Sequence, residues 1–175
     1  MKKIIRETAL TLKKLITCFY ESYSWKDKWV LARYSFKTPF ILLKRFFGKE
    51  TKSNLSSPIF IKNKFGFFHT GDRIYYAFAF TTQSDKRLRE ELKIKEGVFI
   101  DIGANGGMHT IPAALSVGQN GEVIAIEPEP KNFSILKENV ELNKLKNVTC
   151  INTACFKEEK ILKLFLDKEG RGGIP

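Results

Sequence analysis

A glycine-rich turn and two carboxylates form the part of this sequence best suited to bind a ligand. The segment DIGANGG, residues 101–107, follows a short apolar run and precedes a helical pattern. A strand, a glycine-rich turn and a helix in that order form the common nucleotide-binding arrangement of α/β proteins. Glu127 ends the next apolar run, 26 residues after Asp101. A carboxylate there can accept hydrogen bonds from both hydroxyls of a ribose, so the two segments together predict a nucleoside site.

The residue types in the turn select among nucleoside ligands. A dinucleotide fingerprint requires Gly-x-Gly-x-x-Gly, but Asn105 occupies the position of the middle glycine. Asp101 places a negative charge directly before the turn, which would repel a pyrophosphate and attract a cation. S-adenosylmethionine carries a sulfonium and an ammonium group and no phosphate. We therefore predict S-adenosylmethionine as the cofactor, and we disfavour a nicotinamide-dependent oxidoreductase.

Further candidate binding residues follow the second and third apolar runs. Pro128 can offer an apolar face to the adenine, while Asn152 and Ala154 stand where strand ends frame the far side of a nucleotide. Two interpretations of Asn105 stay open: a ligand contact, and a purely structural role in a left-handed backbone conformation. The residue pattern assigns no catalytic group. No metal site is expected, because the three cysteines lack metal-type spacing.

The elements that must position these residues alternate between apolar runs and amphipathic patterns. Alternation with short connections predicts crossover units and a parallel sheet. Asp101, Glu127 and Asn152 would then converge at the edge formed by the carboxyl ends of the strands. The expected strands are 98–102, 122–126, 148–152 and 160–166, and the expected helices are 108–117 and 130–145.

The residues before this sheet are strongly basic. The net charge is +11, and residues 1–94 hold 20 basic and 8 acidic residues, whereas residues 95–175 hold 10 and 11. The first 52 residues are expected to form a basic helical segment. Residues 1–50 either dock on their own protein or lie on an anionic membrane, since both partners suit an amphipathic basic helix. The segment is too polar for a signal peptide or a membrane-spanning helix.

Between the basic segment and the sheet, residues 53–94 are expected to form β-hairpins and a short helix. The runs 57–70 and 73–82 are rich in aromatic and alternating residues, which favours strands. The charged run 84–93 favours a helix. The predicted organisation is thus a basic segment over 1–52, this hairpin region, and a nucleoside-binding domain over 95–175.

Three segments, FIDIGANGGMHTIPAA, GEVIAIEPEPKNFSILKENVELN and NVTCINTACF, resemble the FkbM-type methyltransferases. The resemblance covers about residues 97–166, with a weaker match over 60–80. It implies a class I methyltransferase with a Rossmann-like α/β sheet and S-adenosylmethionine as cofactor. It also implies that Glu127 binds the ribose and that His109 and Thr110 lie near the methionine carboxylate. The residues that it places at the cofactor are Asp101, Gly103, Asn105, Gly107, His109, Thr110 and Glu127.

The resemblance also carries expectations about the acceptor. Members of the family mostly methylate hydroxyls of sugars, lipids or polyketide-like metabolites, which implies O-methylation of a small molecule. The cysteines show no disulfide or metal pattern, which fits a cytoplasmic location. Besides the small-molecule acceptor, an expected partner is the membrane surface, through peripheral contact of residues 1–50. Nucleic acid is disfavoured as a partner. One feature departs from the family, because no strand with the pattern I-K-I-D-x-E-G follows Gly170. The chain is therefore expected to hold only the N-terminal half of the sheet. The alternative function is a truncated, non-catalytic remnant of the fold or a partner-binding fragment.

Overall fold

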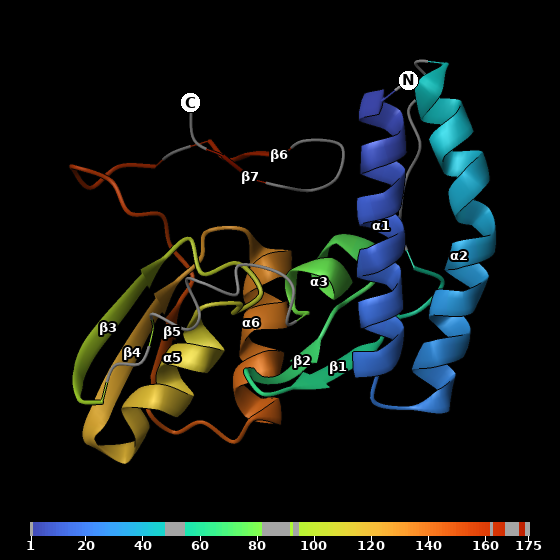
Figure 1. Cartoon of the computed structure of the whole chain (residues 1–175). Helices are drawn as coiled ribbons and strands as arrows, with labels where there is room; N and C mark the ends of the chain where they lie inside the picture. The colour runs from blue at the N-terminus through green and yellow to red at the C-terminus, as the bar shows by residue number, and fades with distance from the viewer. Residues whose placement is uncertain are drawn as a thin grey trace. The chain divides into compact units, whose positions relative to one another are not determined.

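The computed structural model describes residues 2–47, 55–81, 92, 95–161, 163–166 and 172–173 (Figure 1). The chain divides into two compact units. The first comprises Met1–Lys64 with Phe68–Asp85, and the second comprises Phe65–Phe67 with Lys86–Pro175.

The predicted three-part division stays a prediction, because its boundaries at residues 52–53 and 94 lie outside the described residues. The same holds for the helix predicted over 84–93, apart from Leu92.

The first unit begins with two antiparallel helices, α1 (Lys2–Glu21) and α2 (Trp25–Phe46), as the basic helical segment predicted (Figure 1). A capping box fixes the start of α2. The Ser24 Oγ accepts a hydrogen bond from the Asp27 amide at 3.2 Å, and the Asp27 carboxylate accepts from the Ser24 amide at 2.9 Å. In the described residues, no helix combines the length and hydropathy that crossing a bilayer requires.

Residues 55–81 hold a two-stranded sheet and a short helix. Strands β1 (Phe60–Asn63) and β2 (Gly66–His69) form the hairpin expected within 57–70. The strand predicted over 73–82 was wrong, because Ile74–Ala79 form helix α3. The aromatic rings explain the helix. Tyr76 and Phe80 are four residues apart, stack at 5.3 Å and are buried with Phe68. In a strand, residues four apart are separated by about 13 Å, whereas in a helix they are neighbours, so the stacking requires a helical backbone.

The second unit contains the predicted parallel sheet. Strands β3 (Gly97–Ile102), β4 (Gly121–Ile126) and β5 (Val148–Ile151) lie in the order β3-β4-β5, and both pairings are parallel. Helix α5 (Thr110–Val117) connects β3 to β4 through the short 3-10 helix η1 (Gly118–Asn120), and helix α6 (Pro130–Leu142) connects β4 to β5. The predicted Rossmann-like α/β arrangement is therefore present over these three strands and two helices.

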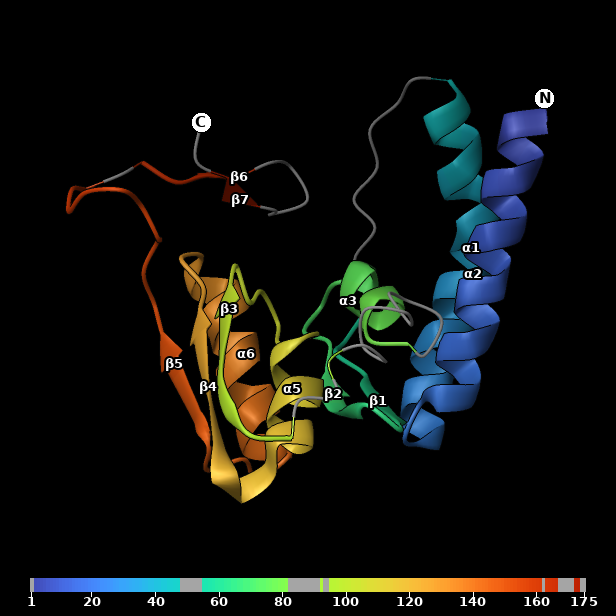
Figure 2. The same ribbon diagram turned by 60° about the vertical axis from the view of Figure 1, so that its left-hand side comes forward.

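Both helices pack on the same face of this sheet (Figure 2). Ala113, Ala114 and Val117 of α5 are buried against Val123 of β4. The opposite face of the edge strand β3 is open, and Val98, Ile100 and Ile102 are 61%, 55% and 66% exposed. The continuous apolar pattern of this strand is therefore buried on one side only within the described residues.

The fourth strand predicted over 160–166 does not join the parallel sheet. Among the described residues of this run, Phe165–Leu166 alone form a strand, β6, which pairs antiparallel with β7 (Gly172–Gly173). A further parallel neighbour of β5 would need a crossover of about a dozen residues. Residues 152–159 contain no helix that could form one.

Candidate functional site

The glycine-rich turn lies over the carboxyl ends of β3 and β4. Asp101 and Ile102 pair with Ala125 and Ile126, so the two strands end together. The amides of the two residues after β3, Gly103 and Ala104, both donate to the Ile126 carbonyl, at 2.9 and 3.0 Å. Asp101 and Glu127 therefore lie at the same edge of the sheet, where the residue pattern placed them.

The backbone of the turn has three residues in the left-handed region. Gly103, Asn105 and Gly107 have φ angles of 78°, 55° and 91°. Asn tolerates this region better than most L-residues, which gives Asn105 the structural role that was one of its two interpretations. A Cβ on Gly103 would meet no atom within 4 Å. The surface beside Gly103 is therefore open to a ligand.

The Glu127 carboxylate is buried at 5% exposure and holds the turn in place. Its Oε2 accepts a hydrogen bond from the Asn105 amide at 2.8 Å, and its Oε1 accepts from the Glu129 amide at 3.0 Å and from the Asn132 Nδ2 at 3.4 Å. A carboxylate offers about four acceptor positions. Oε2 receives a single protein donor among these contacts, which leaves it free to accept a ligand hydroxyl.

Asp101 and the start of α5 form the second side of the site. The Thr110 hydroxyl donates to the Asp101 Oδ2 at 2.6 Å, and both residues are buried. His109 precedes the helix, and its Nδ1 is buried without a hydrogen-bond partner. Buried polar atoms are almost always satisfied. An unpartnered imidazole nitrogen beside the turn therefore suits a site that receives a polar ligand group.

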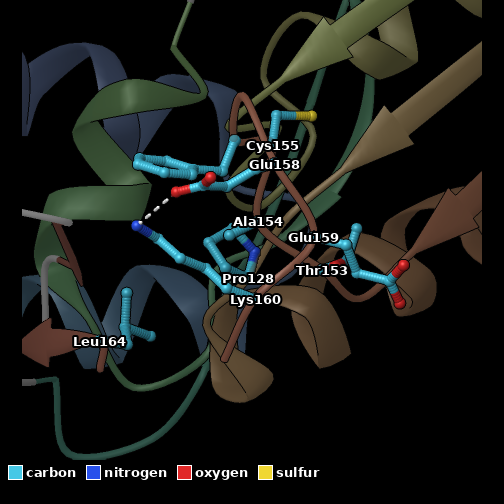
Figure 3. Close-up of a pocket in the computed structure, with 9 residues that line it drawn as sticks. Pro128, Thr153, Ala154, Cys155, Glu158, Glu159, Lys160 and Leu164 are labelled. Carbon is cyan, nitrogen blue, oxygen red and sulfur yellow. Dashed lines mark hydrogen bonds and ion pairs between the residues drawn. The ribbon is translucent and has the colours of Figure 1, made fainter. Parts of the chain in front are cut away.

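The end of β5 closes the third side. The Asn152 Nδ2 donates to the backbone carbonyls of Glu127 at 2.7 Å and Pro128 at 3.2 Å, which ties β5 to the end of β4. Pro128 and Ala154 line one cavity of about 570 Å³ (Figure 3). Among its other walls are the ion-paired side chains of Glu158 and Lys160, 3.0 Å apart, whereas the Glu159 carboxylate points away from that pair.

Asp101 lies at the end of β3, and the other nine predicted site residues lie on the turn, at the start of α5 or on the segments that follow β4 and β5. Within the described residues, no group of three His, Cys, Asp or Glu side chains could hold a metal ion. Burial raises the pKa of the Cys150 thiol on β5 above its ordinary value, and Lys137 lowers it by less. Cys150 is therefore a neutral thiol at physiological pH and not a nucleophile.

Sequence reasoning missed two side chains, one that supports the turn from α6 and one that caps this helix. Asn139 is fully buried, and its Nδ2 donates to the Gly106 carbonyl at 2.8 Å. Glu129 is the N-cap of α6 and accepts from the amides of Lys131 and Asn132 at 3.1 and 2.7 Å. Pro130 at the first helical position was a usable signal for this cap, because the residue before such a proline is the N-cap.

Loss of the Glu129 cap is expected to weaken the second unit. The substitution Glu129→Ala leaves two amides of α6 without their acceptor, and we expect it to lower the free energy of unfolding by about 1 kcal/mol. Urea denaturation followed by circular dichroism measures this. The matched control is Glu141→Ala, an exposed glutamate in the last turn of α6, where a negative charge opposes the helix dipole. Equal destabilisation by both variants would contradict the capping role.

Comparison with known proteins identifies the family. A family model described as the TRM5/TYW2 methyltransferase domain matches residues 67–163, more than half of the chain. The chain belongs to this family. The match supports the predicted methyltransferase and names a family other than the FkbM type. Residues 67–163 therefore belong to a methyltransferase domain of the TRM5/TYW2 family.

The curated relatives match a shorter part of the TRM5/TYW2-family chain. A protein of Sulfurisphaera tokodaii named "Probable cobalt-precorrin-6B C(15)-methyltransferase (decarboxylating)" is 47% identical over 53 residues, which are 30% of this chain and 28% of that protein. A protein of the same name from Sulfolobus acidocaldarius is 38% identical over the same share of each chain. The chain therefore spans less than a third of the length of these curated relatives.

Two solved structures named TYW2 share lower similarity. M. jannaschii TYW2 in complex with AdoMet is 26% identical, with a TM-score of 0.43 over 58% of this chain and 44% of that chain. P. horikoshii TYW2 in complex with MeSAdo is 19% identical, with a TM-score of 0.48 over 65% of this chain and 46% of that chain.

Proposed function

We propose that this chain binds S-adenosylmethionine at the carboxyl ends of β3, β4 and β5 and transfers its methyl group to a small-molecule hydroxyl. The observation that carries the proposal is the pair of buried carboxylates, Asp101 and Glu127, at one edge of the sheet with the open surface of Gly103 between them. Two negative charges beside such a surface attract a ligand that is cationic and lacks phosphate.

Each side of the site has an assigned role in this proposal. Glu127 accepts a ribose hydroxyl through the free position on its Oε2, and Asp101 attracts the amino-acid end of the cofactor. The His109 Nδ1 and the start of α5 face the methionine carboxylate, because a helix N-terminus favours an anion. Pro128 and Ala154 pack on the adenine from the cavity that they line. Asn105 and Gly107 hold the turn, while Asn152 fixes the β5 end relative to Glu127.

The chemistry requires little more from the described residues than orientation. The sulfonium supplies an activated methyl group, and transfer is an in-line displacement by the acceptor oxygen. The turn and the β5 end hold the reacting atoms in line and exclude water. No described residue is assigned as the base that would take the hydroxyl proton.

The small-molecule acceptor rests on three observations. The curated relatives carry the name of a methyltransferase for a cobalt-precorrin, which is a small molecule. The FkbM-type resemblance points to a hydroxyl. The cavity beside Pro128 is lined by Glu158, Glu159 and Lys160, of which Glu158 and Lys160 form an ion pair, and the net negative charge that remains disfavours the phosphates of a nucleic acid.

RNA is the second candidate acceptor, and a specific observation favours it. The family is defined by TRM5 and TYW2, and residues 1–94 supply the excess of basic residues that RNA binding uses. If the acceptor is RNA, the first unit would serve as an RNA-binding region. If the acceptor is a small molecule, the basic residues of the first unit would have a role other than RNA binding.

Two measurements test the proposal. Calorimetric titration is expected to show binding of S-adenosylhomocysteine and none of NAD, and the reverse result would overturn the cofactor assignment. The chain is then incubated with tritium-labelled S-adenosylmethionine and either a small-molecule cell extract or total RNA. We expect labelled product in the small-molecule extract. Label that nuclease removes would show that RNA is the acceptor. Binding of S-adenosylhomocysteine without any methyl transfer would fit the alternative of a non-catalytic fragment.

A further inference from the structure

The two N-terminal helices carry two apolar stripes each, and only one of the two is buried. Leu15 and Cys18 of α1, and Val30 and Leu31 of α2, belong to the core of the first unit. Docking on the chain's own protein therefore accounts for one stripe of each helix. A second set of large apolar side chains on the same helices faces solvent and takes no part in that core.

On α1 the second stripe consists of Leu12, Ile16 and Phe19. Their spacing of four and three residues places them within about 60° of one another around the helix. Their side chains are 57%, 49% and 37% exposed. Two of the three are aliphatic, which suits a hydrocarbon partner better than a stacked base.

On α2 the second stripe is aromatic. Trp25, Trp29, Phe36 and Phe40 are spaced by four, seven and four residues, so they too lie within about 60° of one another. Their side chains are 76%, 68%, 86% and 60% exposed. Four large rings so exposed on one helix face form a patch of the kind that marks an interaction site.

An apolar groove joins the two stripes into one surface. It has a volume of about 470 Å³, and its walls include Leu12, Ile16 and Phe19 of α1 and Phe36 and Pro39 of α2. We call the seven exposed apolar side chains of the two stripes the aromatic face. Its members are Leu12, Ile16, Phe19, Trp25, Trp29, Phe36 and Phe40.

Lysines lie among the rings of the aromatic face. The Lys28 ammonium is 5.5 Å from the ring centroid of Phe19 and 5.1 Å from that of Trp25. The Lys44 ammonium is 4.5 Å from the ring centroid of Phe40. The aromatic face therefore has two components. Its apolar side chains can insert into an apolar layer, and the ammonium groups of its lysines lie next to the aromatic rings.

The acidic residues nearby are few, and both are hydrogen-bonded within the unit. Glu21 and Asp27 are the acidic residues between positions 8 and 47. The Glu21 Oε2 accepts from the Asn63 Nδ2 at 2.8 Å, and Asp27 is 3% exposed and bound to Ser24. The charge that this hairpin presents to solvent is therefore positive, which complements an anionic surface.

We propose that the aromatic face docks the protein on an anionic lipid membrane. Tryptophan prefers the membrane interface, because its ring is apolar while its N–H remains hydrated. Basic residues near inserted apolar side chains add attraction to anionic headgroups. The helices would lie in the interface plane, in keeping with the absence of a spanning helix among the described residues.

Tryptophan fluorescence tests the docking directly. The chain contains two tryptophans, and both belong to the aromatic face. Vesicles of phosphatidylcholine with about one-third phosphatidylserine are expected to shift the emission of the full chain to shorter wavelength and to co-sediment it. Raising the salt should weaken this binding, since exposed charges are screened. Pure phosphatidylcholine should give a much smaller shift.

A matched pair of leucine variants distinguishes docking through the aromatic face from non-specific hydrophobic binding. Leu12→Ser removes an apolar side chain from the aromatic face, and we expect about tenfold weaker vesicle binding. Leu115→Ser changes a leucine of similar exposure, 49%, on α5, and should bind vesicles as the unaltered chain does. Thermal unfolding by circular dichroism confirms that both variants fold.

Several results would overturn the proposal. One is an emission shift of equal size with neutral and anionic vesicles. Another is equal loss of binding in the two leucine variants. A shift produced by RNA in the absence of any response to vesicles would assign the face to nucleic acid. Dimerisation by light scattering that Leu12→Ser abolishes, without vesicle binding, would assign it to a second copy of the chain.

Discussion

The substitution Glu127→Gln is expected to weaken S-adenosylhomocysteine binding by about 10- to 100-fold. In the proposed site the Glu127 carboxylate accepts a ribose hydroxyl while it also accepts the amides of Asn105 and Glu129. Glutamine has the same shape but one oxygen fewer, so its NH₂ must face either a backbone amide or the ligand. Hydrogen bonds to a charged acceptor contribute about 1.5–3 kcal/mol and those to a neutral one about half as much. Isothermal titration calorimetry measures the difference.

A second glutamate on the same strand serves as the control. Glu122 lies at the opposite end of β4, is exposed, and accepts a hydrogen bond from the Thr149 hydroxyl at 3.2 Å. Glu122→Gln removes the same charge from the chain, and we expect unchanged affinity. Equal affinity of Glu127→Gln and Glu122→Gln would place the ligand away from the carboxyl ends of the strands, and the proposed site would be wrong.

The parallel sheet could be predicted from the sequence because its signals are local. Short apolar runs predicted β3, β4 and β5 within one residue at each end, and Pro130 predicted the start of α6. The site followed from the sheet, since parallel strands end at one edge. Asp101 and Glu127 needed no knowledge of tertiary contacts to be placed there.

The errors arose where tertiary packing decides the structure. Residues 74–79 have strand-favouring aromatic side chains, yet Tyr76 stacks on Phe80 and both rings are buried, so packing outweighs propensity. The hydrogen bond from Asn139 to the Gly106 carbonyl joins residues 33 apart. No spacing rule marks such a contact, because it depends on where the turn and α6 meet in the folded chain.

The glycines of the turn are expected to separate stability from ligand binding. In Gly107→Ala the alanine must adopt a backbone φ of 91°. Its Cβ would lie 3.0 Å from the Leu136 Cδ1 and 3.3 Å from the Ile111 Cγ1. Backbone strain and overpacking together are expected to lower the free energy of unfolding by about 3 kcal/mol. The thermal midpoint of the second unit should fall by about 10 °C, measured by scanning calorimetry.

Gly103→Ala is the matched variant, because its φ of 78° brings similar backbone strain while its Cβ meets nothing within 4 Å. We expect it to lower the free energy of unfolding by about 1 kcal/mol, since it lacks the overpacking. It should nevertheless weaken S-adenosylhomocysteine binding more than Gly107→Ala does, relative to the stability that each variant loses. The reason is that its methyl group projects into the surface that the proposal gives to the cofactor. If the two alanines lowered stability equally, the close approach of α6 to Gly107 would not constrain the turn. If Gly103→Ala bound the ligand normally, the open surface beside it would not be the cofactor site.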